Sequence, residues 1–117
     1  MNSDRLRTYC LSLPGATEGI KWEEHIAYMV GEKIFCMTGF TDDTHVTFKV
    51  DPDDFAELTE RDGVEQAAHW AKGQWISIHR RNKLSPKEWE EYIQRSYKMV
   101  KAKLTKKMQK EIDEMQP

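Results

Sequence analysis

The chain has 117 residues, with 18 Lys and Arg against 20 Asp and Glu and a net charge of −2. This length suits one domain, and four Trp with a hydrophobic content of 38% argue against disorder. No apolar run approaches the roughly 18 residues that a membrane span needs, and the first residues do not resemble a signal peptide. We therefore expect residues 1–117 to form a single cytoplasmic domain that does not enter a membrane.

A first helix is predicted at the start of the chain. Asn2 or Ser3 can cap it, apolar residues recur at helical spacing as far as Leu13, and Pro14-Gly15 ends it. Residues 16–24 are then expected to form a polar loop.

Three strands are expected next, at residues 25–30, 34–40 and 44–50. Apolar and polar residues alternate in the first and third of them, whereas the second is mostly apolar, as expected for a central strand. Gly31 permits a tight reversal between the first two, because glycine adopts a positive φ at little cost. The three strands predict an antiparallel meander with one face on a core.

The next helix begins at Asp51-Pro52, where Asp can cap the first turn and Pro suits the first helical position. Residues 64–73 are ambiguous and could form a short strand, a helical turn or a loop. Residues 74–80 alternate again, with Ile76 and Ile78 on one face, and predict a further strand.

Ser85-Pro86 repeats the pairing of a capping residue with proline, and Glu88 completes a capping box. Apolar residues then follow one stripe as far as Leu104, which predicts a helix of about five turns. Thr105 either breaks this helix or caps a short last one, and the segment 106–117 is expected to fray. The order α-β-β-β-α-β-β-α predicts an α+β fold, with an antiparallel sheet of about five strands and helices on one face.

The charge is unevenly distributed along the chain. Residues 1–60 carry five Lys and Arg against twelve Asp and Glu, a net −7, and residues 61–117 carry thirteen against eight, a net +5. Residues 72–110 hold twelve basic and three acidic side chains, a net +9. A polyanion responds to the local potential, although a run of lysines is more often a solvated helix face. The total of −2 therefore does not exclude a nucleic acid as partner.

No catalytic or metal-binding motif stands out. The chain has four histidines: His25, His45, His69 and His79. They show no short paired spacing and no CxxC accompanies them, so we predict no metal and no cofactor, although they could still meet across strands. Cys10 and Cys36 are expected to be buried and unpaired, as in a reducing compartment. We expect the protein not to be an enzyme.

The stretch that follows residue 68 combines aromatic and basic side chains. If Ile76 and Ile78 face the core, Trp75 and His79 face away from it. An exposed Trp beside Lys and Arg can stack on bases while the cations neutralise phosphates. Alternatively, the segment 64–73 or a helix covers Trp75.

Five segments, in order and over nearly the whole chain, form a recognisable set. They are Tyr9-Cys10-Leu11-Ser12-Leu13-Pro14-Gly15-Ala16-Thr17-Glu18, Lys49-Val50-Asp51-Pro52, Lys72-Gly73-Gln74-Trp75, Ser96-Tyr97-Lys98-Met99-Val100 and Lys103-Leu104-Thr105-Lys106-Lys107. The set resembles the MmcQ/YjbR family of small bacterial proteins. The chain differs from the usual pattern of this family at two places. It has Gln74 where the family often has His, and His69-Trp70 where the family often has Tyr or His followed by Met. The resemblance implies a fold similar to the frataxin (CyaY-like) arrangement, also described as a double wing, and a DNA-binding role.

Two functions follow as hypotheses. The first is weak, largely non-specific and non-catalytic DNA binding. Its candidate residues are Lys72, Trp75, Arg80, Arg81, Lys83, Lys98 and Lys101. The alternative is a protein-interaction or small-ligand module on the outward strand face around Trp75, supported by a pocket between Trp22, Trp70 and Trp75. An iron binder or enzyme, suggested only by fold analogy, is disfavoured because Asp4 is the one acid of the first helix. The oligomeric state is open, with a monomer favoured.

Overall fold

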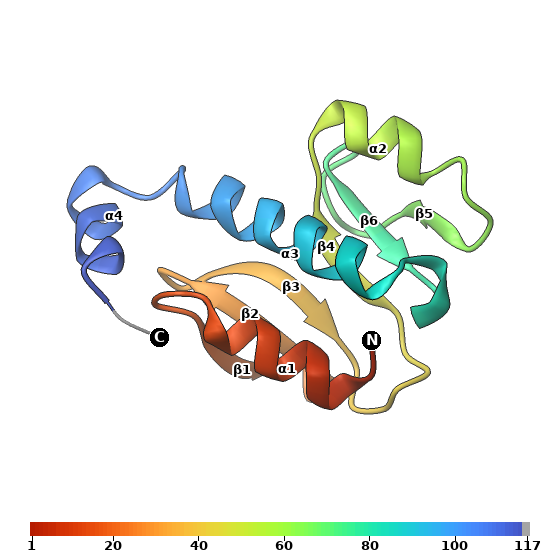
Figure 1. The fold of residues 1–117 in the computed structure, drawn as a ribbon, viewed down its shortest axis with the longest axis horizontal. Coiled ribbons are helices and arrows are strands. Elements are labelled where there is room, and N and C mark those ends of the chain that lie inside the picture. Colours follow the sequence, from red (N-terminus) through yellow and green to blue (C-terminus); the bar gives the residue numbers. More distant parts are fainter. Residues whose placement is uncertain (116–117) are drawn as a thin grey trace.

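The computed structural model describes residues 1–115, and these form one antiparallel sheet with the strand order β1-β2-β3-β4-β6-β5 (Figure 1). The strands are β1 (Thr17–Lys21), β2 (His25–Val30), β3 (Lys33–Thr38), β4 (Val46–Lys49), β5 (Val64–Gln66) and β6 (Trp75–Ile78). The helices are α1 (Ser3–Ser12), α2 (Pro52–Leu58), α3 (Pro86–Lys101) and α4 (Lys106–Asp113), with a 3-10 turn η1 (Arg81–Lys83). The predicted α+β fold is confirmed, and none of the described helices is long and apolar enough to span a membrane.

One prediction in the N-terminal half is wrong. Residues 16–24 are not a loop throughout, because Thr17–Lys21 forms strand β1 at the edge of the sheet. This strand pairs with β2 along its whole length and leaves most of its own side chains exposed. An edge strand with little burial lacks the alternation of apolar residues by which a strand is recognised. Its backbone pairing, rather than its side chains, defines it.

The predicted helix starts are confirmed, and each α helix has a side-chain cap. The four capping residues are Asn2, Asp51, Ser85 and Thr105. Glu88 completes the predicted capping box by accepting a hydrogen bond from the Ser85 N–H, and it also accepts two from the Arg61 guanidinium. The hydrogen bonds from Arg61, followed by that from Ser85, lower the pKa of Glu88 to about 2.

The helices cover one face of the sheet. A cross-strand row on that face enters the core with α1 and α3, and it consists of Tyr28, Cys36, Phe48 and Ile76. We call the opposite side of the sheet the open face. One cross-strand row on it consists of Ala27, Met37, Thr47 and Ser77, and the neighbouring row consists of Lys49 and Trp75. These side chains lie outside the main core cluster, although all of them except Lys49 are buried beneath the loops that border this face. The predicted alternation in β4 and β6 therefore separates a core face from an open face.

One serine of α3 joins β3 to β4 at the middle of the sheet. β3 carries a bulge at Phe35, whose carbonyl accepts a hydrogen bond from Ser96 Oγ at 2.6 Å. The same Oγ accepts the Lys49 N–H at 2.9 Å. Ser96 is fully buried. It thus supplies partners to one carbonyl and one N–H beyond the last direct pair of β3 and β4, which is Cys36 with Phe48.

The helix α4 folds back onto two turns of the chain. Ile112 is buried, and a Cβ added to Gly15 would lie 3.2 Å from its Cγ1 atom. Gly31 has a φ of +55°, and a Cβ there would come within 2.5 Å of Leu104 Cδ1. Glycine at position 31 therefore serves both the reversal and the approach of the chain beyond α3. Fraying of the segment 106–117 stays a prediction, and its last two residues lie outside the described range.

Candidate functional site

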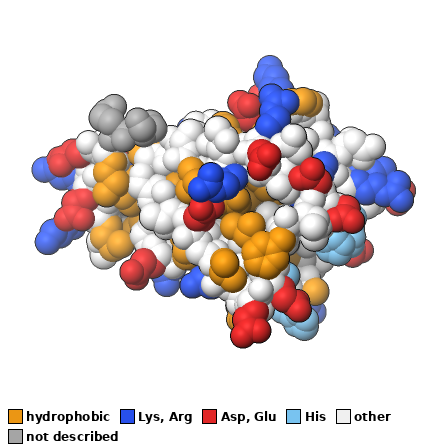
Figure 2. Space-filling view, turned by 90° about the horizontal axis from the view of Figure 1, so that it is seen from below, with side chains coloured by type: hydrophobic (Ala, Val, Ile, Leu, Met, Phe, Trp, Pro, Cys, Tyr) orange, Lys and Arg blue, Asp and Glu red, His pale blue; other side chains and the backbone are white. Residues whose placement is uncertain are grey.

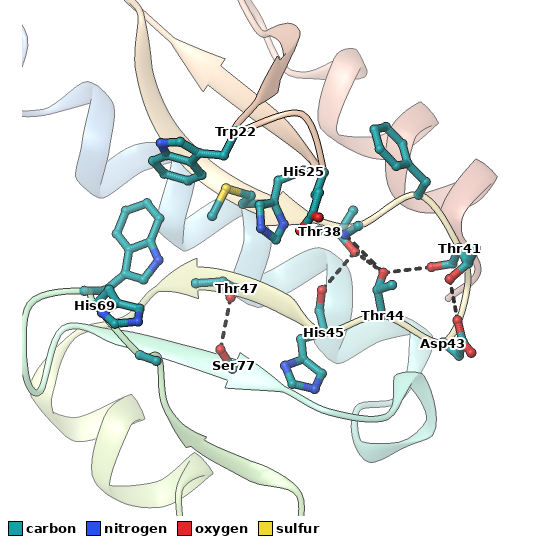
Figure 3. Close-up of a pocket in the computed structure, with 16 residues that line it drawn as sticks. Trp22, His25, Thr38, Thr41, Asp43, Thr44, His45, Thr47, His69 and Ser77 are labelled. Atoms are coloured by element: carbon teal, nitrogen blue, oxygen red, sulfur yellow. Dashed lines mark hydrogen bonds between the residues drawn. The ribbon is translucent and has the colours of Figure 1, made fainter.

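A groove of about 1060 Å³ crosses the open face of the sheet (Figure 3). Its floor includes Thr47 of β4 and Ser77 of β6, whose hydroxyls lie 3.0 Å apart in a hydrogen bond. Three connections form its walls: the β1–β2 turn, the β3–β4 loop and the β5–β6 loop. Its volume is at the upper end of the size of small-molecule sites, and it spans the boundary between β3 and β4.

Tryptophans stand on two sides of the groove. Trp22, in the β1–β2 turn, is 69% exposed and meets His25 edge to face at 6.0 Å between ring centroids. Trp70, in the β5–β6 loop, lies against Trp75 with 4.1 Å between centroids. Trp75 faces away from the core, as expected, but it is only 8% exposed. The covering of Trp75 by the segment 64–73 is therefore the alternative that the structure shows, and Trp70 presents the aromatic surface instead.

Two residues that line the groove have a strained backbone. Trp22 has a φ of +52° and His69 a φ of +70°, and Glu23 beside the first has +62°. A left-handed conformation costs a residue other than glycine about 1–2 kcal/mol. Such strain persists only where other contacts or a function maintain it. Here the strained backbone places the exposed side chain of Trp22 over the groove.

The groove combines apolar walls with acidic rather than basic charges. Among residues 1–115, its charged lining residues are Glu24 and Asp43, and no Lys or Arg lines it. Burial of the imidazole, followed by the neighbouring charge of His79, lowers the pKa of His45, which favours its neutral form. Figure 2 shows hydrophobic side chains gathered near the centre of one face of the molecule, with acidic, histidine and basic side chains around them.

The histidines do not assemble a metal centre. The rings of His45 and His79 lie 3.9 Å apart, and His79 Nε2 is 2.8 Å from Glu65 Oε1 but outside hydrogen-bond geometry. Within residues 1–115 no group of three His, Cys, Asp or Glu side chains is arranged to hold an ion. The His45–His79 contact is therefore a packed aromatic pair at the edge of the open face.

The basic residues predicted to contact DNA have different surroundings. Lys72, Arg80 and Lys98 are exposed, and none has a carboxylate within 4 Å among the described residues. Lys72 precedes β6 and Arg80 follows it, so they lie at opposite ends of that strand. Lys101 forms an ion pair with Asp113. The structure therefore separates Lys72 from Arg80 along β6 and compensates the charge of Lys101.

Arg81 and Lys83 belong to the packing around η1. The Arg81 guanidinium donates hydrogen bonds to five oxygens, which are Met1 O, Ser3 Oγ, Thr38 Oγ1, Thr41 O and Thr44 O. Lys83 is half-buried, and its carbonyl accepts a hydrogen bond from Arg61. These contacts argue against Arg81 as a phosphate ligand.

Sequence reasoning missed the contribution of the β3–β4 loop to the groove. Phe40, 52% exposed, lines the groove together with Thr41 and Asp43. The sequence does carry a signal, because Phe40 is a large apolar residue placed directly before a polar turn, where no core can cover it. The fold of this loop rests on Thr44 Oγ1, which donates to Thr41 O and accepts the Gly39 N–H.

The comparisons with known proteins concern the whole fold. The YjbR family model matches residues 11–99, which is more than half of the chain. A Deinococcus radiodurans protein with a DUF419 domain is similar in structure, with a TM-score of 0.86, 25% identity, and coverage of 99% of this chain and 89% of its own. A Pseudomonas syringae protein has the same fold, with a TM-score of 0.72, 20% identity, and coverage of 86% and 99%. No curated protein matches the chain. The chain therefore belongs to the YjbR family.

Proposed function

We propose that this protein is a non-catalytic binding module whose groove on the open face takes a small molecule with a planar, apolar body that is neutral or positively charged. The observation that carries the proposal is the composition of the groove. Trp22 and Trp70 offer aromatic faces, and Glu24 and Asp43 are the only charged residues that line it in the described part of the chain. Aromatic faces attract cations and planar groups, and carboxylates repel anions.

The floor of the groove supplies a polar point of attachment. Thr47 and Ser77 hydrogen-bond to each other, and each hydroxyl has remaining capacity to bind a ligand group. His45, the neighbouring base, packs against His79 rather than reaching either hydroxyl as a hydrogen-bond partner within the described structure. Neither of these two hydroxyls has a base positioned to activate it as a nucleophile in the described structure, which supports binding without catalysis.

Three probes that share one ring test the proposal: benzyltrimethylammonium, benzyl alcohol and benzoate. We expect the cation to bind at least as tightly as the alcohol, and the benzoate about tenfold more weakly than the cation, as measured by tryptophan fluorescence and calorimetry. Trp22→Gly is expected to abolish binding while leaving the free energy of unfolding unchanged or raising it by about 1 kcal/mol, because glycine relieves the positive φ.

Ile20→Ala is the matched control, because Ile20 is a large exposed side chain of β1 that does not line the groove. It should leave the binding of benzyltrimethylammonium unchanged. Benzoate binding as tight as that of the cation, or full binding by the Trp22→Gly variant, would show that the groove is not the site.

Weak and non-specific DNA binding is the second candidate function. It is supported by the family resemblance and by the exposed side chains of Lys72, Arg80 and Lys98, which have no carboxylate within 4 Å in the described part of the chain. Each phosphate contact contributes about 0.9 to the slope of log affinity against log salt. If Lys72 and Arg80 each contact one phosphate, the double variant Lys72→Ala/Arg80→Ala should lower the magnitude of that slope by about 2.

A salt-titrated fluorescence anisotropy assay with a duplex oligonucleotide measures this slope. Arg7→Ala is the control, because Arg7 is paired with Glu18 at 2.8 Å and its charge is already compensated. An unchanged slope in the double variant, or no binding at low salt, would rule out DNA binding through these residues.

We place this function in a reducing, cytoplasmic setting. Cys10 and Cys36 are both buried and free, although the thiol of one contacts the other. Burial, followed by the contact with Cys36, raises the pKa of the Cys10 thiol, so it is protonated and inert at neutral pH. Such a pair suits a compartment that keeps thiols reduced.

A further inference from the structure

A second pocket, of about 600 Å³, lies beside the Trp70–Trp75 pair and away from the floor of the groove. Three lysines from three separate parts of the fold line it: Lys33, Lys49 and Lys103. The two tryptophans form an aromatic wall, and Val100 and Leu104 add an apolar one. The pocket therefore combines lysine side chains with apolar and planar surfaces.

The fold itself brings these lysines together. Lys49 ends β4 on the open face, directly opposite Trp75 in the register of β4 with β6. Lys33 begins β3 immediately after the turn at Gly31, and that turn lies against Leu104. The residue before Leu104 is Lys103, so the close approach that Gly31 permits also brings Lys103 to the same pocket.

The charges of this pocket are not balanced. Glu32 is its only acidic lining residue against three lysines, and none of the three has a carboxylate within 4 Å among residues 1–115. Burial, followed by the proximity and charge of the Lys103 side chain, lowers the pKa of Lys49. Two ammonium groups held together without a counter-ion destabilise the free protein, and a bound anion would remove that repulsion.

We propose that this pocket binds a small organic phosphate, with the phosphate between Lys49 and Lys103 and a planar group against Trp70 and Trp75. A phosphate suits the site because it carries up to two negative charges and accepts several hydrogen bonds from ammonium groups. A nucleoside monophosphate has both required parts. This site is separate from the groove of the proposed function, with which it shares only Trp70.

The probes are AMP, adenosine and inorganic phosphate, tested by calorimetry on the full chain at low salt. We expect AMP to bind at least about tenfold more tightly than either part alone, because the two walls of the pocket contact different parts of it. Equal affinities for adenosine and AMP would overturn the role of the lysines. Equal affinities for inorganic phosphate and AMP would overturn the role of the tryptophans, and no binding of any probe would overturn the site.

Lys103→Gln tests the assignment of the lysines. Lys103 is exposed, so the fold should survive, and AMP affinity should fall by about tenfold or more while the melting temperature stays the same or rises. A rise in the melting temperature together with a loss of AMP affinity would show that the repulsion between Lys49 and Lys103 destabilises the free protein and serves ligand binding. Lys107→Gln, at an exposed lysine of α4 outside the pocket, should change neither quantity.

Lys49→Met is the second variant, because methionine keeps an unbranched apolar side chain beside Trp75 and removes the charge. It should also weaken AMP binding by about tenfold. Unchanged AMP affinity in both lysine variants, or an equal loss in Lys107→Gln, would overturn the proposal. Neither Lys49 nor Lys103 lines the groove, so both variants should bind benzyltrimethylammonium normally, which separates a failure of this site from a failure of the proposed function.

Discussion

The variant Ser96→Ala is expected to lose about 2–4 kcal/mol of unfolding free energy, a large effect for the removal of one oxygen atom. Ser96 Oγ donates to Phe35 O and accepts the Lys49 N–H, and the residue is fully buried. Alanine would leave both backbone groups without a partner, and each buried unsatisfied group costs about 1–3 kcal/mol. Because no large cavity forms, hydrogen bonding alone accounts for the loss.

Urea unfolding measures this effect, with Ser12→Ala as the matched control. Ser12 Oγ also donates to a backbone carbonyl, that of Tyr9, but the serine is exposed, so water can replace it. The control should change the free energy of unfolding by no more than about 0.5 kcal/mol. A loss below about 1 kcal/mol in Ser96→Ala would mean that Phe35 O and the Lys49 N–H find other hydrogen-bond partners, and it would contradict this prediction.

The second large effect is expected at Arg81. Its guanidinium donates to five oxygens of the N-terminal residues, the end of β3 and the β3–β4 loop, including Met1 O and Thr38 Oγ1 at 3.1 Å each. Arg81→Met keeps most of the side-chain volume but removes these donors, so we expect a loss of about 2–4 kcal/mol in unfolding free energy. The variant should also weaken ligand binding in the groove, because the β3–β4 loop forms one of its walls.

Arg80→Met is the adjacent control for this measurement. Arg80 is exposed and has no carboxylate within 4 Å in the described residues, so its replacement should leave stability within about 0.5 kcal/mol. Chemical denaturation of the two variants gives the comparison. Equal stabilities would contradict a structural role for Arg81 and restore it as a candidate phosphate contact.

Most of the fold could be predicted because its signals are local. Asp51-Pro52 and Ser85-Pro86 mark helix starts through the chemistry of the first turn, which does not depend on distant residues. The alternation of Val46 and Phe48 with Thr47 fixes which side of β4 meets the core. β1 escaped prediction because pairing with β2, not its own composition, makes it a strand.

The candidate site could be predicted only in part, because exposure and pairing are long-range properties. The sequence shows that Trp75 faces away from the core, but not that Trp70 covers it. It shows that Arg81 is basic, but not that the N-terminus supplies an acceptor for it. The strained turn that presents Trp22 is equally hidden, since tryptophan is not a residue from which a positive φ is expected.

The way β3 meets β4 has a mechanical consequence. The sheet consists of two three-stranded halves, β1-β2-β3 and β4-β6-β5, which are joined by three residue pairs and by the side chains of Ser96, Thr38 and Arg81. Trp22 belongs to the first half and Trp70 to the second. The distance between the two rings therefore depends on the angle at which the two halves of the sheet meet. A ligand held by both rings would fix that angle. Ser96, on the opposite side of the sheet, would then resist changes in it through its two hydrogen bonds.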